Sequence, residues 1–249
     1  MVSIKSDREI ELMRDAGKIL AETHDAIAEF IKPGISTYDI DKFAEKNVKK
    51  LGGECSFYHL YDFPGNFCIS VNDEVIHGIP SKTKIIKEGD VIKIDGGVCY
   101  KGYQSDAART HIVGKTSKEI EDLVERTRNS FFEALKVCVP GNHINDIGIA
   151  ITNYINQFGY GVVEEYVGHG IGTKVHEDPE IPNFITKKKG PVLKKNMTLA
   201  IEPMINLGTL EVYTAEDEWT VRTCDGLPSS HYENTIVITD NEPQILSII

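Results

Sequence analysis

The sequence lacks any long apolar run, which excludes a membrane-spanning helix. Such a helix needs about 18 or more consecutive apolar residues, and no segment of the 249-residue chain approaches that length. The apolar stretch of a secretory signal is also missing from the first residues, Met1-Val2-Ser3-Ile4-Lys5-Ser6-Asp7. We therefore expect a cytoplasmic protein that does not bind membranes.

Cysteine is scarce, and its arrangement excludes two common structural frameworks. The five cysteines are odd in number, and no two of them have the C-x-x-C spacing. This arrangement argues against a disulfide scaffold and against a structural zinc site. We expect reduced thiols in a reducing compartment.

An excess of positive charge is also absent. The chain has 27 Lys and Arg residues against 38 Asp and Glu residues, which gives a formal net charge of −11. A negative surface repels phosphate backbones, so nucleic acid is not an expected partner. The one basic cluster, Lys187-Lys188-Lys189 with Lys194-Lys195, is interpreted as a solvated loop, with contact to ribosomal RNA as the alternative.

Helical and strand patterns occur twice along the chain, in the same order. The first set consists of helical patterns at 6–32 and 36–51 and strand patterns at 68–71, 91–94 and 103–113. The second set consists of helical patterns at 117–138 and 145–158 and strand patterns at 162–167, 197–201 and 235–239. No low-complexity linker separates the two sets, so we expect them to share one core.

The two sets align without gaps at a single offset of 107 residues, which places Pro33 on Pro140, Gly52 on Gly159 and Asp95 on Glu202. Any one of these matches is weak, but a common offset indicates an internal repeat. The sequence therefore predicts one α+β domain over residues 1–249. Its two pseudo-symmetric αα–ββ halves, roughly 6–114 and 115–249, would form a site where they meet.

Two carboxylates interrupt the apolar strand patterns of the first half. Asp95 follows an apolar run, and Asp106 lies eleven residues later, beyond a turn candidate at Tyr100-Lys101-Gly102. In a hairpin symmetric about that turn the two side chains would be directly opposite, with Cβ atoms about 5 Å apart. Carboxylates at that separation repel unless a cation or a proton lies between them. The alternative is a pair of exposed aspartates in a loop.

Two further acids and three histidines complete the candidate set. Glu202 ends one apolar strand pattern, and Glu233 precedes another. His169 is bracketed by glycines that leave its imidazole accessible, while His176 and His77 lie in other loops. Each histidine could instead be structural. Carboxylates with an imidazole suit Mn, Fe, Co or Zn, and bridging carboxylates usually hold two such ions about 3.5–4 Å apart.

Five blocks of the sequence occur in the order typical of a known enzyme family. They are Cys68-Ile69-Ser70-Val71-Asn72, His77-Gly78-Ile79-Pro80, Gly168-His169-Gly170-Ile171-Gly172, Ile201-Glu202-Pro203 and Glu233-Asn234-Thr235. In these blocks the chain resembles the bacterial type I methionine aminopeptidases, from about Ile10 to near the C-terminus. The resemblance implies the pita-bread fold, in which two pseudo-symmetric αα–ββ halves surround a central antiparallel sheet.

The resemblance also implies a centre with two divalent metal ions and a pocket for methionine. The implied metal ligands are Asp95, Asp106, His169, Glu202 and Glu233, with Asp106 and Glu233 bridging the ions. The implied catalytic residues are His77 and His176 near the scissile amide and Glu202 as the proton shuttle. The implied pocket residues are Cys55, Tyr58, Tyr61, Cys68 and Trp219.

The expected activity is metal-dependent removal of the N-terminal methionine from peptides and nascent proteins, with a preference for a small second residue, by a monomer. Several residues depart from the family pattern: Asn234, Val175, Gly96-Gly97 and Ala107-Ala108-Arg109. None of them removes an implied ligand, so we expect effects on metal affinity or pocket shape.

Two other functions fit parts of the sequence. An Xaa-Pro peptidase of the same fold is one, although such relatives usually carry an additional N-terminal domain, whereas here the first helical pattern begins at Ser6. A non-catalytic peptide-binding protein is the other, although such proteins tend to lose metal ligands and all five implied ligands are present.

Overall fold

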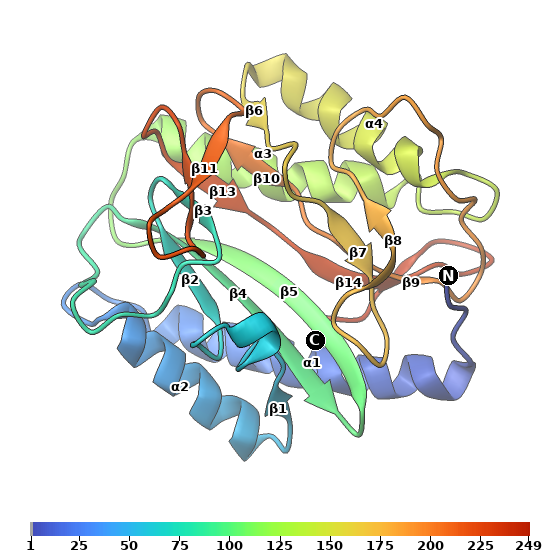
Figure 1. Cartoon of the computed structure of the whole chain (residues 1–249), viewed down its shortest axis with the longest axis horizontal. Coiled ribbons are helices and arrows are strands. Elements are labelled where there is room, and N and C mark those ends of the chain that lie inside the picture. The colour runs from blue at the N-terminus through green and yellow to red at the C-terminus, as the bar shows by residue number, and fades with distance from the viewer. Residues whose placement is uncertain (1) are drawn as a thin grey trace.

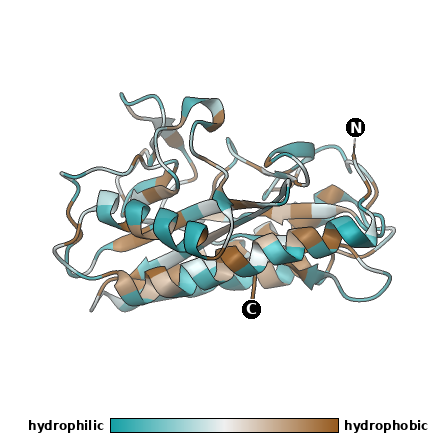
Figure 2. Ribbon diagram, turned by 90° about the horizontal axis from the view of Figure 1, so that it is seen from below, coloured by the Kyte–Doolittle hydropathy of each residue, from teal (hydrophilic) through white to brown (hydrophobic). Residues whose placement is uncertain are grey.

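The computed structural model describes residues 2–249, and the helices of this part of the chain come in two pairs. They are α1 (Asp7–Phe30), α2 (Thr37–Lys50), α3 (Lys118–Leu135) and α4 (Ile144–Ile155). Figure 2 shows the helices in a layer on one side of the strands, with loops crossing the other side. The four predicted helices are thus confirmed, with ends shifted by a few residues. None of the described helices has the length and apolar character needed to cross a bilayer.

Local hydrogen bonds explain where the first two helices begin. Ser6 accepts a bond from the backbone N–H of Glu9, and the Glu9 carboxylate accepts one from the backbone N–H of Ser6 at 2.7 Å. Ser36 and Asp39 form the same reciprocal pair before α2. These capping boxes satisfy N–H groups that have no partner inside the helix.

The strands form antiparallel pairs that are grouped into two larger and two smaller sheets. The first larger sheet has the order β1 (Glu54–Cys55), β4 (Val91–Tyr100), β2 (Cys68–Val71), with β5 (Tyr103–Ile112) also paired to β4. The second has the order β15 (Gln244–Ile245), β14 (Asn234–Val237), β9 (Thr198–Ile201), β7 (Gly168–Gly170), β8 (Glu177–Ile181).

The smaller sheets extend these at one end of the molecule. One has the order β13 (Ser229–His231), β10 (Met204–Asn206), β6 (Gly161–Val162). The other has the order β11 (Val212–Thr214), β12 (Val221–Thr223), β3 (Glu74–Ile76). In Figure 1 they lie above β2 and beside the ends of α3 and α4. The short helical turns Leu60–Asp62 and Asn156–Phe158 complete the described elements.

The register of the β4–β5 hairpin differs from the sequence prediction. The turn consists of Lys101 and Gly102, both with positive φ, so Tyr100 pairs with Tyr103. Consequently Asp95 pairs with Ala108, and Asp106 pairs with Gly97. The two carboxylates are diagonal neighbours on one face and do not lie directly opposite each other. The prediction placed the centre of the turn one residue too early, which shifts the pairing by two.

Matching local structure recurs at the predicted offset of 107 residues. Gly34 and Gly141 both lie in the turn between the two helices of a pair and have positive φ, at 93° and 96°. The isolated β-bridges of the structure are Ser36–Ile85 and His143–Val192, which are related by the same offset. These matches support an internal repeat, and its boundaries stay a prediction.

Two main apolar clusters join the helices to the sheets. One contains side chains of α1 and α2 with Phe67, Ile69, Ile92 and Ile94, and the other contains side chains of α3 and α4 with Leu199 and Ile236. Figure 2 shows both hydrophilic and hydrophobic residues along the helices, as expected of amphipathic helices that pack an apolar stripe on a sheet. This packing fixes the sheets from the side opposite the loops.

The two larger sheets meet along a seam between β5 and the start of β14. The Asp106 N–H donates to the Thr235 hydroxyl at 2.8 Å, and that hydroxyl donates to the Asp106 carbonyl at 2.9 Å. One step further, the Glu233 N–H donates to the Ala108 carbonyl at 3.0 Å. The seam therefore brings acids from the two halves of the chain together.

His24 in α1 links the helical layer to this region and predicts a pH effect on stability. Its ring is 3% exposed, and Nε2 lies 3.0 Å from the carbonyl of Ala107. Because a carbonyl only accepts, Nε2 carries the proton. Burial, followed by the positive charges of Arg109 and His111, holds the pKa of His24 well below its usual value.

Below a pH of about 6.5 the unfolded chain takes up a proton at this position that the folded chain does not. The free energy of unfolding should therefore fall with decreasing pH, by up to about 1.4 kcal/mol per pH unit from this group. His24→Gln keeps a donor for Ala107 and should show a correspondingly shallower slope between about pH 6.5 and 5 in urea titrations. His59→Gln, at an exposed position, is the control. Equal slopes in His24→Gln and wild type would contradict the prediction.

Candidate metal centre

The five predicted metal-binding side chains come from five separate segments. Asp95 lies on β4, Asp106 on β5 and His169 on β7. Glu202 directly follows β9, and Glu233 directly precedes β14. All five line one cavity of about 280 Å³, and four of the residues are 9% exposed or less, with Glu202 half-buried. The structure thus brings the whole predicted set to one place.

The distances between these groups leave room for an ion at their centre. Asp106, His169 and Glu233 each offer a ligand atom, and these atoms lie within 4.8 Å of one another. His169 Nε2 is 3.9 Å from Asp106 Oδ2 and 3.7 Å from Glu202 Oε1, which is too far for hydrogen bonds. Buried oxygens of Asp95, Asp106 and Glu233 have no hydrogen-bond partner.

The raised pKa values of the acid cluster also indicate a site for a cation. Burial raises the pKa of Asp95 to about 7. Burial, followed by the charges of neighbouring acids, raises the pKa values of Asp106, Glu202 and Glu233 well above their usual range. A cluster of this kind is unfavourable as free carboxylates and needs protons or a cation to offset the repulsion.

The imidazole of His169 is held in a tautomer suited to ligation. Its Nδ1 lies 2.9 Å from the carbonyl oxygen of Gly170, so Nδ1 carries the proton and donates it. Nε2 is therefore a free lone pair that faces the acids. Burial, followed by the charge of His176, lowers the pKa of His169 to about 4, which keeps the ring neutral. A backbone partner on the other ring nitrogen is the usual support of a ligating histidine.

The glycines around His169 allow three strands to approach closely. A Cβ on Gly168 would lie 2.4 Å from the carbonyl oxygen of Ala200 on β9. A Cβ on Gly170 would lie 2.1 Å from the carbonyl oxygen of Asp178 on β8. Larger residues at either position would push β7 away from its neighbours. The glycine bracket seen in the sequence therefore serves strand packing as well as access to the imidazole.

One end of the cavity is apolar. The buried cluster of Phe57, Phe63, Cys68 and Val175 packs there with the half-buried Trp219, whose ring lies 5.1 Å from that of Phe63. An unbranched thioether fits such a slot, because sulfur and aromatic groups make favourable contacts with it. The predicted pocket residues Cys68 and Trp219 both line the cavity.

The other predicted pocket residues are placed differently. Tyr61 lines the cavity and is 69% exposed, with its ring 5.7 Å from that of His176, so it lies at the mouth. Cys55 and Tyr58 are not part of the lining. Cys55 pairs with Val98 at the edge of the sheet and packs towards the helices, whereas Tyr58 is exposed and contacts the ring of His59. The prediction for these two residues does not match the observed lining.

The two predicted catalytic histidines lie on the cavity wall. His77 is in contact distance of Tyr166 and Trp219, with ring centroids 5.6 and 6.3 Å away. His176 lies 4.5 Å from the ring of His169. Burial, then the charge of His176, lowers the pKa of His77 to about 4, and burial lowers that of His176. Both rings are therefore neutral near pH 7 and can donate one hydrogen bond each.

Sequence reasoning missed several residues of the site. Phe57 and Phe63 belong to an aromatic-rich loop, and that clustering of aromatic residues in a loop was the available signal. His231 is 1% exposed, with Nε2 3.7 Å from Glu202 Oε2. It lies two residues before Glu233, so alternation along an extended strand could have placed both on one face. Tyr166 gave no signal in the sequence.

The residues present fit a divalent metal. The buried carboxylate oxygens without partners, together with one neutral imidazole nitrogen, form an oxygen-rich donor set with a single nitrogen. Such a set suits borderline-to-hard ions. One of the departures noted in the sequence has a packing role: Gly96 makes room for the buried ring of Phe67, which would lie 2.0 Å from a Cβ there.

Comparisons with known proteins agree with this geometry. The model of metallopeptidase family M24 matches residues 11–240. A methionine aminopeptidase of Clostridium acetobutylicum is 49% identical over 248 residues, which is 100% of this chain and 99% of that protein. The crystal structure of methionine aminopeptidase from Thermotoga maritima matches with a TM-score of 0.98 and 41% identity over 100% of both chains.

A prolidase from Pyrococcus furiosus is more distant, with a TM-score of 0.80 and 27% identity, and the match covers 99% of this chain but 65% of the prolidase. The predicted pita-bread fold and the predicted enzyme class are confirmed by these likenesses. The chain belongs to metallopeptidase family M24, among the bacterial type I methionine aminopeptidases.

Proposed function

We propose that the chain removes the N-terminal methionine from peptides and nascent proteins whose second residue is small, with two divalent ions (Co, Mn, Fe or Zn) held by the buried acid cluster. The observation that carries the proposal is the meeting of Asp106, His169 and Glu233, with ligand atoms within 4.8 Å of one another, beside an apolar slot. Membership of a metallopeptidase family implies use of a divalent metal.

Each side chain has a distinct task in this proposal. Asp95, Asp106, His169, Glu202 and Glu233 would hold the ions, with Asp106 and Glu233 shared between them. A divalent ion, when bound, polarises a carbonyl and supplies a nucleophile at neutral pH. Glu202, at the edge of the cluster, takes a proton from the attacking water and passes it to the leaving amine. His77 and His176 donate hydrogen bonds to the substrate amide as charge develops on its oxygen.

The apolar slot decides which side chain is cleaved off. Phe57, Phe63, Cys68 and Trp219 would surround the methionine thioether. The proposed preference for a small second residue would be set at the mouth of the cavity, where the rings of Tyr61 and His176 lie. The proposed ligands and the apolar slot all lie within this chain, and we propose that it works as a monomer.

The proposed function is tested with peptides that distinguish a methionine aminopeptidase from an Xaa-Pro peptidase and from a peptide-binding protein. Metal-loaded protein should release methionine from Met-Ala-Ser and Met-Gly-Ser much faster than from Met-Leu-Ser, and should leave Ala-Pro uncleaved. Cleavage of Ala-Pro as the best substrate would instead favour an Xaa-Pro peptidase. Binding of peptides without turnover at any metal concentration would favour a peptide-binding protein.

His176→Ala tests whether that residue acts on substrate. Because its ring lies beside the cluster but outside the ligand set, we expect kcat to fall by about 10²–10³-fold, the range for loss of one donor to a developing oxyanion. The metal content, measured by elemental analysis, should equal that of wild type. A protein that loses its metal would make His176 a ligand or a structural residue.

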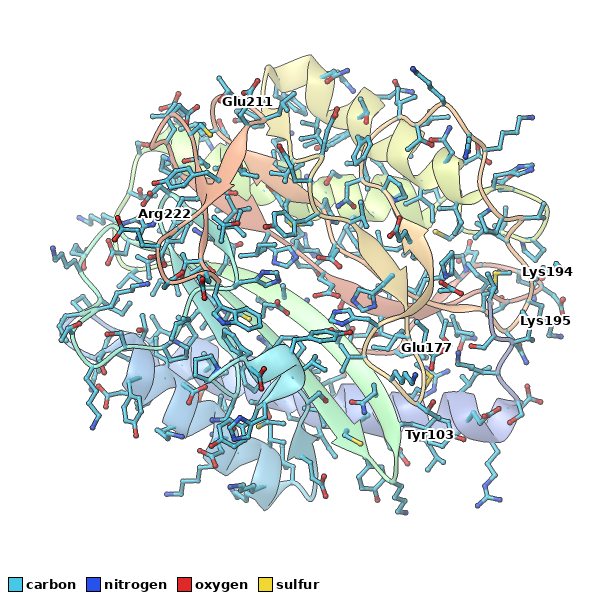
Figure 3. The ribbon with its side chains drawn as sticks, in the orientation of Figure 1. Tyr103, Glu177, Lys194, Lys195, Glu211 and Arg222 are labelled. Carbon is cyan, nitrogen blue, oxygen red and sulfur yellow. The ribbon has the colours of Figure 1, made fainter. Side chains whose placement is uncertain are left out.

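Location and partners follow from the substrate. We place the protein in the cytoplasm, where new chains are made, and the five cysteines are free thiols in the structure. Figure 3 shows Lys194 and Lys195 side by side at the edge of the molecule, and neither residue lines the cavity. Lys195 forms an ion pair with Asp240, as expected of a solvated loop. Nucleic acid therefore has no part in the proposal.

A further inference from the structure

Arg109 is a largely buried cation directly behind the acid cluster. Its Nη1 donates to the Glu233 carbonyl at 2.6 Å and to the Ala108 carbonyl at 2.9 Å. The guanidinium also lies 4.7 Å from the ring of Tyr232. Within residues 2–249 its hydrogen-bond acceptors are all neutral oxygens, and the charges of Glu233 and Asp25 act on it only from a longer distance. A buried guanidinium held only by neutral oxygens is costly, so its geometry calls for a role.

Asn234 accepts a hydrogen bond from the other side of the guanidinium. Arg109 Nη2 donates to Asn234 Oδ1 at 2.7 Å, and the Ser247 hydroxyl donates to the same oxygen at 2.9 Å. Asn234 is fully buried, and its Nδ2 has no partner. The residue thus acts here as an acceptor for two donors. Loss of that oxygen would leave the Ser247 hydroxyl without this acceptor and would leave Nη2 with only the longer bond to the Ser247 carbonyl at 3.3 Å.

These bonds continue to the second shared acid. Ser247 accepts a bond from the Thr235 N–H at 3.1 Å, and Thr235 is bonded to both the N–H and the carbonyl of Asp106. The chain of bonds therefore runs from Glu233 through Arg109 and Asn234 to Asp106. It crosses the seam between the two sheets, and the two acids at its ends come from different halves of the sequence.

We propose that Arg109 and Asn234 act as one pair of positioning residues that sets the distance between Asp106 and Glu233. The inference rests on the proposed role of these two acids as shared metal ligands. Glu233 lies just outside the paired part of β14, so the ladder with β9 begins only at Asn234. Its backbone is fixed instead by the Ala108 carbonyl and by Arg109.

A double-mutant cycle tests the pair, with Mn²⁺ as the probe. Arg109→Lys keeps the charge but cannot span the oxygens of Glu233 and Asn234, and Asn234→Leu removes the acceptor. Each should weaken Mn²⁺ binding to metal-free protein by about 10–100-fold in calorimetric titrations, as loss of a supporting partner usually does. The double variant should bind about as weakly as the weaker single variant, because the two residues act as a unit.

The controls separate positioning from stability. Arg126→Lys removes a guanidinium stacked 4.4 Å from the ring of Phe158 on the surface of α3, and it should leave Mn²⁺ affinity unchanged. Melting temperatures of the metal-free proteins are measured in parallel. A lower melting temperature with unchanged Mn²⁺ affinity in Arg109→Lys and Asn234→Leu would make the pair merely structural and overturn the inference. If the loss of Mn²⁺ affinity in the double variant equals the product of the two single losses, the residues act independently and the proposed coupling is overturned.

One further variant distinguishes this inference from the function on which it rests. Glu233→Gln should lower the number of Mn²⁺ ions bound per chain or abolish binding. Unchanged binding in Glu233→Gln, or no binding by wild type, would overturn the metal-centre assignment together with the inference. If Glu233→Gln loses Mn²⁺ binding as expected while Arg109→Lys and Asn234→Leu bind Mn²⁺ with wild-type affinity, the inference alone is overturned.

Discussion

Replacing Glu202 with Gln should lower kcat by about 10²–10⁴-fold, the range that a positioned general acid–base group contributes. The substitution keeps the shape of the side chain but removes its ability to take up a proton. KM for a Met-Ala peptide should change far less, because Glu202 lies at the edge of the cluster and outside the apolar slot. Steady-state kinetics with metal content measured on the same sample give the answer.

Glu180→Gln is the matched control for this experiment. Glu180 also lines the cavity but is exposed on β8, where it pairs with His169 across the strands. Its replacement removes the same charge from the same cavity, and kcat should stay within a few-fold of wild type. Near-normal turnover in Glu202→Gln, with both ions bound, would remove Glu202 from the mechanism.

Metal binding should raise the thermal stability of the protein substantially, and Asp106→Asn should abolish most of this gain. At a Mn²⁺ concentration about 100 times Kd, linkage adds about 2.7 kcal/mol to the free energy of unfolding. For a chain of this size that corresponds to a rise in Tm of roughly 5–11 °C. Differential scanning calorimetry with and without Mn²⁺ measures the difference.

Without metal, Asp106→Asn should be at least as stable to heat as wild type. Asp106 is buried beside Asp95 and Glu233, and burial with the charge of Asp95 raises its pKa well above the usual value. Replacing it by a neutral amide removes part of this repulsion, so metal-free Asp106→Asn should unfold at the same temperature as wild type or higher. The control Glu211→Gln removes an acid at the periphery (Figure 3) and should respond to Mn²⁺ as wild type does. An undiminished Mn²⁺ response in Asp106→Asn would contradict its role as a ligand.

Local interactions made the helices predictable. The Ser6–Glu9 and Ser36–Asp39 capping boxes are bonded within four residues, and the first helix ends at Phe30, shortly before Pro33-Gly34. Strand β2 was predicted to the residue, and its C-terminal end coincides with the change from the apolar Val71 to the polar Asn72. The candidate acids were also visible, since each one stands beside an apolar run, although Asp95 and Asp106 lie within β4 and β5 and only Glu202 and Glu233 flank a strand.

Long-range contacts decided the features that were missed or misplaced. The pairing of Asp95 with Ala108 depends on a turn whose centre could be read one residue earlier. Cys55 was placed in the pocket, but its strand turns it towards the helices. Lys93 lies in an apolar strand and is 1% exposed, with Nζ bonded to the carbonyl of Asn72 at 2.6 Å, a partner 21 residues away.

By itself, the sequence determined which side chains could bind an ion, which segments are helical and that the chain repeats. Those properties depend on residue type and on neighbours a few positions away. Only the tertiary structure decided how the seam joins the segments of Asp106 and Glu233, that Arg109 and Asn234 lie behind these acids, and that His231 Nε2 lies 3.7 Å from Glu202 Oε2. Each of these depends on the seam where two sheets meet, and no local pattern specifies how two separately formed sheets align.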